Sequence, residues 1–337
     1  MLNFDEARFL RIQGGAVDLG PAIAAAVAKA LTGGARNLFF LGAGGAAILM
    51  HPAAQLLQRQ SGLPTFAEIG AELVGAGHRH LGRDSLVVIP SLSGTTKESV
   101  EALAWCKARG ATTIVLTGHD GTPLATAADH AFVNFAEDDT SCESFYLQSL
   151  LLALAVLHHR GEIDDHAAVV AELARLPALL VAVKRAFEPE AAALAARLAA
   201  EPWHILTAAG AAWPQAWYYG MCILEEMQWI RTRPVHAADF FHGTLELVEK
   251  GVSVIVMKGE DAARPLAERV ERFLPAYTDK ATVLDAAAFD LPGISPRVRA
   301  LVSPVLLATV LERLSAHLEV VRKHPLTTRR YYKRVAY

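Results

Sequence analysis

Short apolar runs alternate with longer stretches of helical spacing along the first half of the chain. Five runs of mainly apolar residues predict strands, and the Ala- and Leu-rich segments between them have the apolar spacing of helices. The predicted strands are 37–41, 65–68, 86–90, 113–117 and 131–135. Strands that alternate with helices in this way are typical of a parallel sheet with helices on both faces.

The same pattern restarts in the second half, after a stretch that predicts helices alone. Helices are expected over 144–158, 161–200 and 302–322, and strand-like runs return at His204, Val252 and 281–284. We therefore predict an α/β chain of two tandem units, each a doubly wound parallel five-stranded sheet flanked by helices. The expected bounds are 1–160 for the first domain with its N-terminal helix, 161–200 for a helical connection, and 201–337 for the second domain with a C-terminal tail.

Composition and charge narrow the class of protein further. A chain of 337 residues, 53% hydrophobic and 20% charged, is long enough for about two globular domains. The net charge of −3 gives no overall field that would favour nucleic acid or an anionic membrane surface. The three cysteines have no CxxC spacing, the N-terminus lacks a signal-peptide layout, and no apolar run approaches the roughly 20 residues of a membrane span. We expect a soluble, cytoplasmic protein.

The segment Ser91-Leu-Ser-Gly-Thr-Thr-Lys-Glu-Ser99 joins the third predicted strand to a predicted helix. Backbone N–H groups and the positive dipole end of a helix N-terminus bind anions, and Ser and Thr hydroxyls add donors. The segment lacks the GxxxxGK[ST] pattern of a nucleotide P-loop, so a phosphomonoester such as a sugar phosphate is favoured over a nucleoside triphosphate. A hydroxyl side chain that caps an ordinary helix explains the segment equally well.

The first strand is followed by Gly42-Ala-Gly-Gly-Ala-Ala47, which fits the GxGxxA fingerprint of dinucleotide-binding proteins. With Glu68 near a ribose, this alternative predicts a nicotinamide-dependent dehydrogenase. Glycines are needed there whenever any anion approaches the first helix closely, and a dinucleotide leaves the hydroxyl-rich segment unexplained. We favour a sugar phosphate, with the backbone of Gly44 and Gly45 contacting the phosphate.

A second set of candidate residues lies in the second half. Glu225 and Glu226 stand in a predicted helix over 222–230, with Glu226 near its C-terminal end, and His242 precedes a glycine in Asp239-Phe-Phe-His-Gly243. A carboxylate and an imidazole suit proton transfer between adjacent carbons of a sugar. In a chain with 13 histidines, solvated helix charges and a loop histidine are the better explanation of an arbitrary Glu/His pair.

Other polar clusters point to no metal and no nucleic acid. His78, His80 and the pair 158–159 lack the acidic or Cys partners of a metal site. The basic C-terminal tail contains Tyr331 and Tyr332, which favours packing on its own domain over a nucleic-acid arm.

Taken together, these residues resemble the sugar isomerase (SIS) domain family, and within it the fructosamine-6-phosphate (fructoselysine-6-phosphate type) deglycases. The isomerase half of glucosamine-6-phosphate synthase is a more distant resemblance. The segment from Ser91 resembles the family's SxSGxTxE phosphate loop, in which Ser91, Ser93 and Thr96 supply the hydroxyls. Ser141 resembles the serine that opens the next ligand loop, near the sugar. The resemblance covers nearly the whole chain as two tandem SIS domains.

The Glu/His pair gains specificity from the same resemblance. Glu226 and His242 stand 16 residues apart, as the catalytic glutamate and the HG-motif histidine do in the family. Residues 239–246 are similar to the deglycase motif EFFHGxxE, and the tail from His324 resembles the deglycase C-terminus. Lys333 falls where the synthase has a C-terminal lysine that reaches the sugar site.

Two positions depart from the family pattern. Ala46 stands where relatives carry the serine of CGGS, so contact there must come from backbone N–H groups. Leu92 stands where relatives carry His, Gln or Lys in the phosphate loop. Both departures loosen the assignment of a particular substrate.

The resemblance implies an enzyme that hydrolyses a 6-phosphofructosyl-amine, an Amadori product, to glucose 6-phosphate and an amine or amino acid. It implies that Ser91, Ser93 and Thr96 hold the phosphate, that His242 helps to open the ring and acts as an acid, and that Glu226 moves a proton from C1 to C2. No metal or redox cofactor is expected. In related enzymes the HG histidine reaches into the neighbouring subunit's site, so we expect a homodimer. The expected ligand is a small sugar phosphate.

Three alternatives remain open at this point. An aldose–ketose or amino sugar phosphate isomerase would use the same Glu/His pair. A non-catalytic phosphosugar-binding regulator would need a DNA-binding domain, and only about 20 residues precede the first core helix. A nicotinamide-dependent dehydrogenase would bind its cofactor at the glycine-rich turn.

Overall fold

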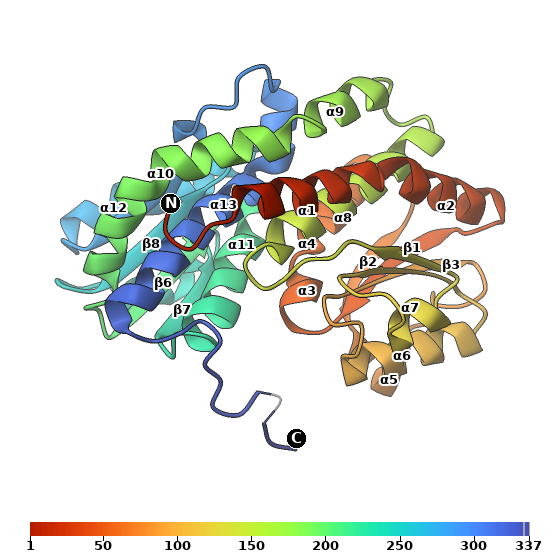
Figure 1. The fold of residues 1–337 in the computed structure, drawn as a ribbon, viewed down its shortest axis with the longest axis horizontal. Helices are drawn as coiled ribbons and strands as arrows, with labels where there is room; N and C mark the ends of the chain where they lie inside the picture. Colours follow the sequence, from red (N-terminus) through yellow and green to blue (C-terminus); the bar gives the residue numbers. More distant parts are fainter. Residues whose placement is uncertain (333, 337) are drawn as a thin grey trace. The chain divides into compact units, whose positions relative to one another are not determined.

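The computed structural model describes residues 1–332 and 334–336, in two compact units. The N-terminal unit is Glu6–Pro177, and the C-terminal unit is Ala178–Tyr337 together with Met1–Asp5. Each unit contains a parallel β-sheet flanked by helices (Figure 1). The predicted α/β class is therefore confirmed for both halves of the chain.

The sheet of the N-terminal unit has five parallel strands in the order β2-β1-β3-β4-β5. Every residue of β1 and β3 is buried, because helices cover both faces of the sheet. All five predicted strands are confirmed to within a few residues. The strands are β1 (Asn37–Gly42), β2 (Thr65–Ile69), β3 (Ser85–Ser91), β4 (Thr112–Thr117) and β5 (His130–Val133).

Helices α5, α6 and α7 cover one face of this sheet, and α2, α4 and α8 lie on the other (Figure 1). On the first face, Leu73, Leu103 and Leu124 pack against Phe39 and Val87 of the strands. The helices are α1 (Glu6–Asp18), α2 (Gly20–Thr32), α3 (Gly44–Ile48), α4 (His51–Gln60), α5 (Gly70–Ala76), α6 (Lys97–Ala108), α7 (Pro123–Ala127), α8 (Ser141–His159) and α9 (His166–Leu173).

Three helical stretches among the described residues are long and apolar enough to cross a membrane, judged by length and composition alone. They are Glu6–Thr32, Ser141–His159 and Pro296–Arg322, of which 39%, 94% and 83% is buried inside the structure. The expectation that no apolar run approaches that length is therefore wrong. The second and third stretches are largely apolar because protein surrounds most of their length.

The sheet of the C-terminal unit has four parallel strands in the order β7-β6-β8-β9. The prediction of five strands in this half is wrong for the part of the chain that the structure describes, because β9 leads through a loop into a 27-residue helix, α13. The strands are β6 (Trp203–Ala208), β7 (Arg231–His236), β8 (Ser253–Lys258) and β9 (Ala281–Asp285).

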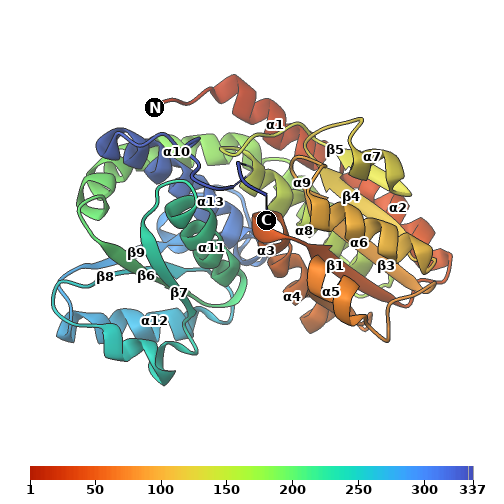
Figure 2. The ribbon, with the colours of Figure 1, turned by 90° about the horizontal axis from the view of Figure 1, so that it is seen from below.

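Helix α12 covers one face of the four-stranded sheet, and α11 and α13 lie on the other (Figure 2). Helix α10 spans most of the stretch that was predicted to be a helical connection. The helical segments are α10 (Leu176–Leu198), η1 (Gly210–Ala212), α11 (Trp213–Tyr218), η2 (Tyr219–Glu225), η3 (Phe240–His242), η4 (Thr244–Leu247), α12 (Arg264–Phe273), η5 (Leu274–Ala276), η6 (Ala286–Ala288) and α13 (Pro296–Arg322).

A buried ion network holds the first five residues in the C-terminal unit. The side chains of Lys184 and Arg313 are fully buried, and both pair with Glu312. Arg313 also donates to the carbonyl of Leu2 at 2.7 Å, and the Leu2 N–H donates to Glu188 at 2.6 Å. Buried charges are tolerated only when they are paired in this way, so removing one partner would be strongly destabilising.

Candidate active site

The strand order of the N-terminal unit creates one natural ligand position. Strand β2 lies on one side of β1 and strand β3 on the other, so the strand order reverses between β1 and β3. Open α/β sheets bind ligands at such a switch point, at the carboxyl ends of the strands. Strand β1 ends at Gly42 and strand β3 at Ser91. The structure therefore brings the glycine-rich turn and the hydroxyl-rich segment to adjacent strands at one edge.

The same strand order argues against a dinucleotide fold. In the dinucleotide-binding order 3-2-1-4-5-6, the second strand lies between the first and third. Here β1 lies between β2 and β3, which is the other doubly wound order. The GxGxxA match is thus a glycine-rich turn in a different topology.

The residues of the segment from Ser91 to Thr96, called the phosphate loop below, bond to one another. The Ser91 and Thr96 hydroxyls lie 3.1 Å apart, and the Gly94 N–H donates to the Ser91 hydroxyl at 3.2 Å. The Thr95 N–H and hydroxyl donate to the Ser93 hydroxyl at 3.3 and 3.1 Å. These bonds fix the hydroxyls in place before any ligand arrives.

Neighbouring loops hold the phosphate loop from outside. Gly94 has φ +65°, and a Cβ there would lie 2.1 Å from the Thr122 hydroxyl oxygen, so only glycine fits. The Gly94 carbonyl accepts from the Leu124 N–H at 3.2 Å, and the Leu92 carbonyl accepts from the Gly118 N–H at 3.0 Å. The turn is therefore defined by its surroundings as well as by its own bonds.

The helices that follow both loops begin without a side-chain cap. Thr96 precedes α6 and Ala43 precedes α3, and neither side chain accepts a bond from the helix N-terminus. The alternative that the hydroxyls merely cap the helix is therefore not supported, since the Thr96 hydroxyl contacts Ser91 instead. Gly44, with φ +56°, has open space where a Cβ would stand. Both helix starts present N–H groups to an anion.

Ser141 lies at the same edge of the sheet. It is the first residue of α8, follows the loop after β5, and is 4% exposed. That loop is held by the side-chain amide of Gln13, which donates to the Thr140 carbonyl at 2.9 Å. Because β5 is parallel to its neighbours, its carboxyl end meets the edge that carries the phosphate loop.

Glu226 lies at the end of an unusual helical segment in the C-terminal unit. Helix α11 continues into the π-helical turn η2, which ends at Glu225, so the predicted helix over 222–230 stops earlier than expected. The Glu226 N–H donates to the Met221 carbonyl, five residues back, at 3.1 Å. π-Helical turns occur frequently at functional sites, because they displace a side chain from the regular spiral.

The two neighbouring glutamates have different surroundings. Glu225 is exposed and accepts a hydrogen bond from the Thr232 hydroxyl. Glu226 is half-buried, and its carboxylate pairs with the Arg329 guanidinium at 2.9 Å. Arg329 belongs to the C-terminal tail and was not predicted as a site residue. The only signal for it in the sequence was the basic and aromatic character of that tail.

The tail is anchored beside Glu226 by further contacts. The Gln228 side chain donates to the His324 carbonyl at 2.7 Å, and the His324 ring meets Trp229 edge-on at 4.6 Å. The Arg330 guanidinium lies 4.1 Å from the centre of the Trp229 ring. The prediction that the tail packs on its own domain is confirmed as far as Arg330, whereas Tyr331 and Tyr332, on which the prediction rested, are exposed. Lys333 lies outside the described residues.

His242 projects from a loop that follows β7. It is exposed, and no hydrogen-bond partner of its imidazole is found among the described residues. The fully buried Phe240 anchors the loop in the core, and Gly243 turns it with φ +149°. The imidazole of an exposed histidine on an anchored turn is accessible to a ligand or to another subunit.

Glu226 and His242 lie at opposite ends of the same strand. Glu226 precedes β7 and His242 follows it, and six extended residues span about 20 Å. The structure therefore does not bring this predicted pair together within one chain. Ser91, Ser93, Thr96, Gly44, Gly45 and Ser141, in contrast, share one sheet edge.

The C-terminal unit has an equivalent switch point, between β6 and β8, but a carboxylate fills it. The Ala211 N–H donates to Asp261 at 2.7 Å, and a Cβ on Gly210, whose φ is +59°, would lie 2.2 Å from the same carboxylate. Asp261 thus occupies the position that an anionic ligand would take. Asp261 was not predicted as a functional residue. Its segment lacks the hydroxyl side chains of the phosphate loop.

Comparison with known proteins identifies the family. The model of the SIS domain matches residues 34–158. The chain is 32% identical to fructosamine deglycase FrlB of Bacillus subtilis over 306 residues, which cover 89% of this chain and 92% of the relative. It is 28% identical to fructoselysine 6-phosphate deglycase of Escherichia coli O157:H7, over 88% of this chain and 85% of the relative.

A solved structure agrees with these relatives. A Bacillus subtilis protein described as a phosphosugar isomerase superposes with a TM-score of 0.86 at 29% identity, covering 94% of this chain and all of the other. The chain belongs to the SIS-domain family, in the group that contains the fructosamine deglycases.

Proposed function

We propose that this protein is a deglycase that hydrolyses 6-phosphofructosyl-amines to glucose 6-phosphate and an amine or amino acid. The observation that carries the proposal is the phosphate loop at the switch point of a chain whose relatives, over most of its length, are named deglycases. A phosphate ester suits an edge with several hydroxyls and two uncapped helix N-termini.

In this proposal the N-terminal unit binds the phosphosugar. The hydroxyls of Ser91, Ser93 and Thr96 donate to the phosphate, together with backbone N–H groups of α6 and of Gly44 and Gly45. The buried Ser141 contacts the sugar from the start of α8. Charge-assisted hydrogen bonds of this kind are about twice as strong as neutral ones, so the phosphate supplies much of the binding energy.

The chemistry requires one proton transfer and one addition of water. Glu226 takes a proton from C1, and the C1–H electron pair forms a C1–C2 double bond. The π pair of the C2 carbonyl moves to its oxygen, which accepts a proton from the acid His242, and the product is an enaminol. A proton returned to C2 then gives the C1–nitrogen imine. Water adds to C1, the C1–N bond breaks, and the amine leaves with glucose 6-phosphate as the other product. Arg329 orients the Glu226 carboxylate for the first step, and His242 assists ring opening as an acid.

The neighbouring glutamates provide a matched test. Glu226→Gln should abolish release of glucose 6-phosphate while substrate still binds, because the amide keeps the shape and loses the base. Glu225→Gln should keep turnover close to the unchanged enzyme, since Glu225 is exposed and its carboxylate accepts a hydrogen bond from the Thr232 hydroxyl. Glucose 6-phosphate is assayed with a panel of phosphorylated fructosyl-amino acids. Near-normal turnover by Glu226→Gln would overturn the role of Glu226.

An aldose–ketose or amino sugar phosphate isomerase is the second candidate. It is supported by the similarity to the Bacillus subtilis structure described as a phosphosugar isomerase. The same base would move a proton between C1 and C2 without hydrolysis. Product analysis separates the two candidates, because an isomerase yields an isomeric sugar phosphate from a sugar phosphate and releases no amine from a fructosyl-amine.

We further propose that the C-terminal unit is a second SIS domain and that the protein acts as a homodimer. The strand order β7-β6-β8-β9 repeats the order β2-β1-β3-β4 of the first unit. A homodimer in which His242 acts in the partner's site explains why His242 is exposed and lies a strand's length from Glu226.

The thiols Cys106, Cys142 and Cys222 carry no disulfide, which supports a reducing, cytoplasmic compartment.

Mixing two inactive variants tests the shared site. If His242 completes the partner's site, then Glu226→Gln and His242→Ala subunits should regain about a quarter of normal turnover after mixed refolding, because half of the dimers are mixed and each has one intact site. Each variant refolded alone serves as the control. No regain, with mixed dimers present by mass, would contradict the shared site.

A further inference from the structure

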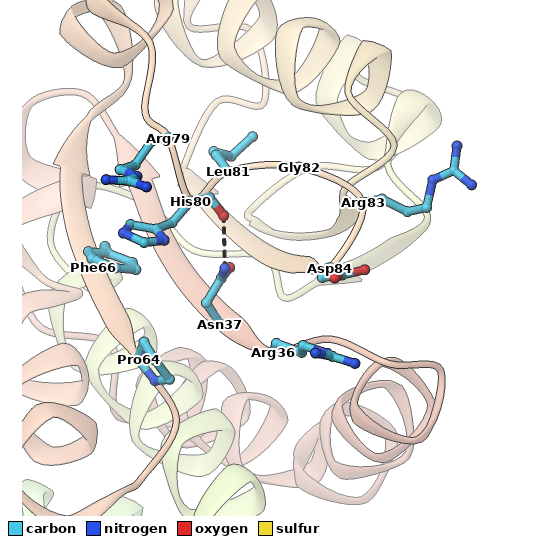
Figure 3. A pocket seen from close by; sticks show the side chains of 10 residues that line it. All are labelled: Arg36, Asn37, Pro64, Phe66, Arg79, His80, Leu81, Gly82, Arg83 and Asp84. Carbon is cyan, nitrogen blue, oxygen red and sulfur yellow. Dashed lines mark hydrogen bonds between the residues drawn. The ribbon is translucent and has the colours of Figure 1, made fainter.

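A cavity of about 610 Å³ lies at the edge of the N-terminal sheet where the strands begin (Figure 3). Asn37 opens β1, Pro64 comes just before β2, and Asp84 comes just before β3. The phosphate loop lies at the opposite edge, and the seven residues of β3 separate the two by about 20 Å. Two ligands could therefore bind to this unit at the same time.

The lining of the cavity is rich in positive charge. It contains Arg36, Arg79, Arg83 and His80, against the single carboxylate of Asp84. Within residues 1–332 and 334–336, none of the three guanidinium groups forms an ion pair. In Figure 3, Arg79 lies beside the His80 ring, Arg36 lies on the opposite side of the cavity near Asp84, and Arg83 points away from the cavity. Guanidinium groups in such a position favour a phosphate or carboxylate.

A buried polar atom in the lining also requires a ligand. Asn37 is 9% exposed and its side-chain N–H₂ donates to the His80 carbonyl at 2.8 Å (Figure 3). This bond fixes which end of the amide faces the carbonyl, since only the nitrogen can donate. The Asn37 Oδ1 atom is buried and has no hydrogen-bond partner among the described residues. A hydroxyl donor on a ligand would satisfy it.

One wall of the cavity is flat and aromatic. The His80 ring stacks on Phe66 with centroids 5.8 Å apart and an angle of 10°, and Arg79 lies beside them (Figure 3). The His78 ring meets Phe66 edge-on, with centroids 4.7 Å apart. Such a wall suits the apolar face of a sugar or the ring of a base.

From these contacts we propose that the cavity is a second binding site, for a phosphate ester of a hydroxylated sugar. Arg79 binds the phosphate, Asn37 accepts from a sugar hydroxyl, and the wall of His80 and Phe66 holds the ring. Arg36 adds a second positive charge on the opposite side of the cavity. A free sugar phosphate and a nucleotide share this chemistry. The cavity volume is within the range of sites for molecules of this size.

The test first weakens ligand binding at the phosphate loop by combining Ser91→Ala and Thr96→Ala in one variant. Isothermal titration calorimetry then measures glucose 6-phosphate, AMP and inorganic phosphate separately. At least one of the two esters should bind at one equivalent, more tightly than inorganic phosphate. The ester that binds identifies the source of the ligand.

The arginines are then replaced in the same background. Arg36→Gln with Arg79→Gln should weaken binding of the ester by at least about tenfold, because one charge-assisted contact and a second positive charge are lost. Arg11→Gln, an exposed arginine of α1, should leave it unchanged. All these side chains are exposed, and thermal unfolding checks that each variant folds.

Three results would overturn the inference. They are no binding of either ester, binding that the double arginine variant does not weaken, or binding of inorganic phosphate as tight as that of both esters. In the first case the arginines would serve only as counter-charges to the helix C-termini at this edge. None of these measurements depends on catalysis, so they remain valid if the proposed deglycase activity is absent.

Discussion

Replacing Gly94 with alanine should damage the phosphate loop specifically. The backbone at Gly94 has φ +65°, and an added Cβ would lie 2.1 Å from Oγ1 and 2.6 Å from Cβ of Thr122. Rotation of the Thr122 side chain moves its Oγ1 atom but leaves its Cβ in place. The two loops must therefore separate, which strains the bond from the Leu124 N–H to the Gly94 carbonyl.

The size of the effect follows from two separate costs. A left-handed conformation costs a residue with a side chain roughly 1–2 kcal/mol, and an overlap that shifts the backbone costs about 1–3 kcal/mol. We expect Gly94→Ala to lower the free energy of unfolding by about 2–5 kcal/mol and to weaken phosphosugar binding by at least about tenfold.

Gly121→Ala separates the two costs. Gly121 has φ +67° in the next loop, but nothing lies within 4 Å of an added Cβ. This variant should lose only the conformational part of the stability and keep normal affinity. Urea unfolding and calorimetric titration with glucose 6-phosphate measure both quantities. Unchanged affinity in Gly94→Ala, or equal loss of affinity in both variants, would refute the reasoning.

Three further predictions concern other sites. Arg329→Gln should reduce kcat by about ten- to a hundredfold by freeing Glu226, whereas Arg330→Gln should not; equal rates would contradict the orienting role. Ala46→Ser should lower KM for a phosphorylated substrate several-fold by restoring a hydroxyl, about 1 kcal/mol of binding, and an unchanged or higher KM would argue against contact there. Burial lowers the pKa of His204 from 6.5 to about 4. The unfolded chain therefore binds this proton first, and the free energy of unfolding should fall by up to about 3 kcal/mol between pH 6.5 and pH 4; His204→Gln should flatten that part of the urea-derived pH profile.

The strands of the core could be predicted because burial on both faces leaves a plain apolar run. Strand β7 escaped prediction because Arg231, Arg233 and Pro234 interrupt its pattern. The strand tolerates these residues because it lies at the edge of the sheet, where a proline need not cost a hydrogen bond between two strands. A similar local effect misplaced the end of the helix at Glu226, because a π-helical turn has no simple sequence pattern.

The candidate site was predicted in part. The phosphate loop and the glycine-rich turn could be predicted because each follows a strand. That these two strands are neighbours at the switch point is known only from the strand order of the structure. Arg329 and Asp261 were missed because each acts through a partner far away along the chain, Glu226 in one case and Ala211 in the other. Contacts across 50 residues or more cannot be predicted from local spacing.

The most direct test of the account compares fructosyl-lysine 6-phosphate with unphosphorylated fructosyl-lysine as substrates. We predict that the enzyme releases glucose 6-phosphate and lysine from the first and leaves the second intact, and that Ser91→Ala raises KM for the first by about tenfold. Equal turnover of both compounds, or no amine released from either, would contradict the claim that the phosphate loop positions a phosphosugar for deglycation.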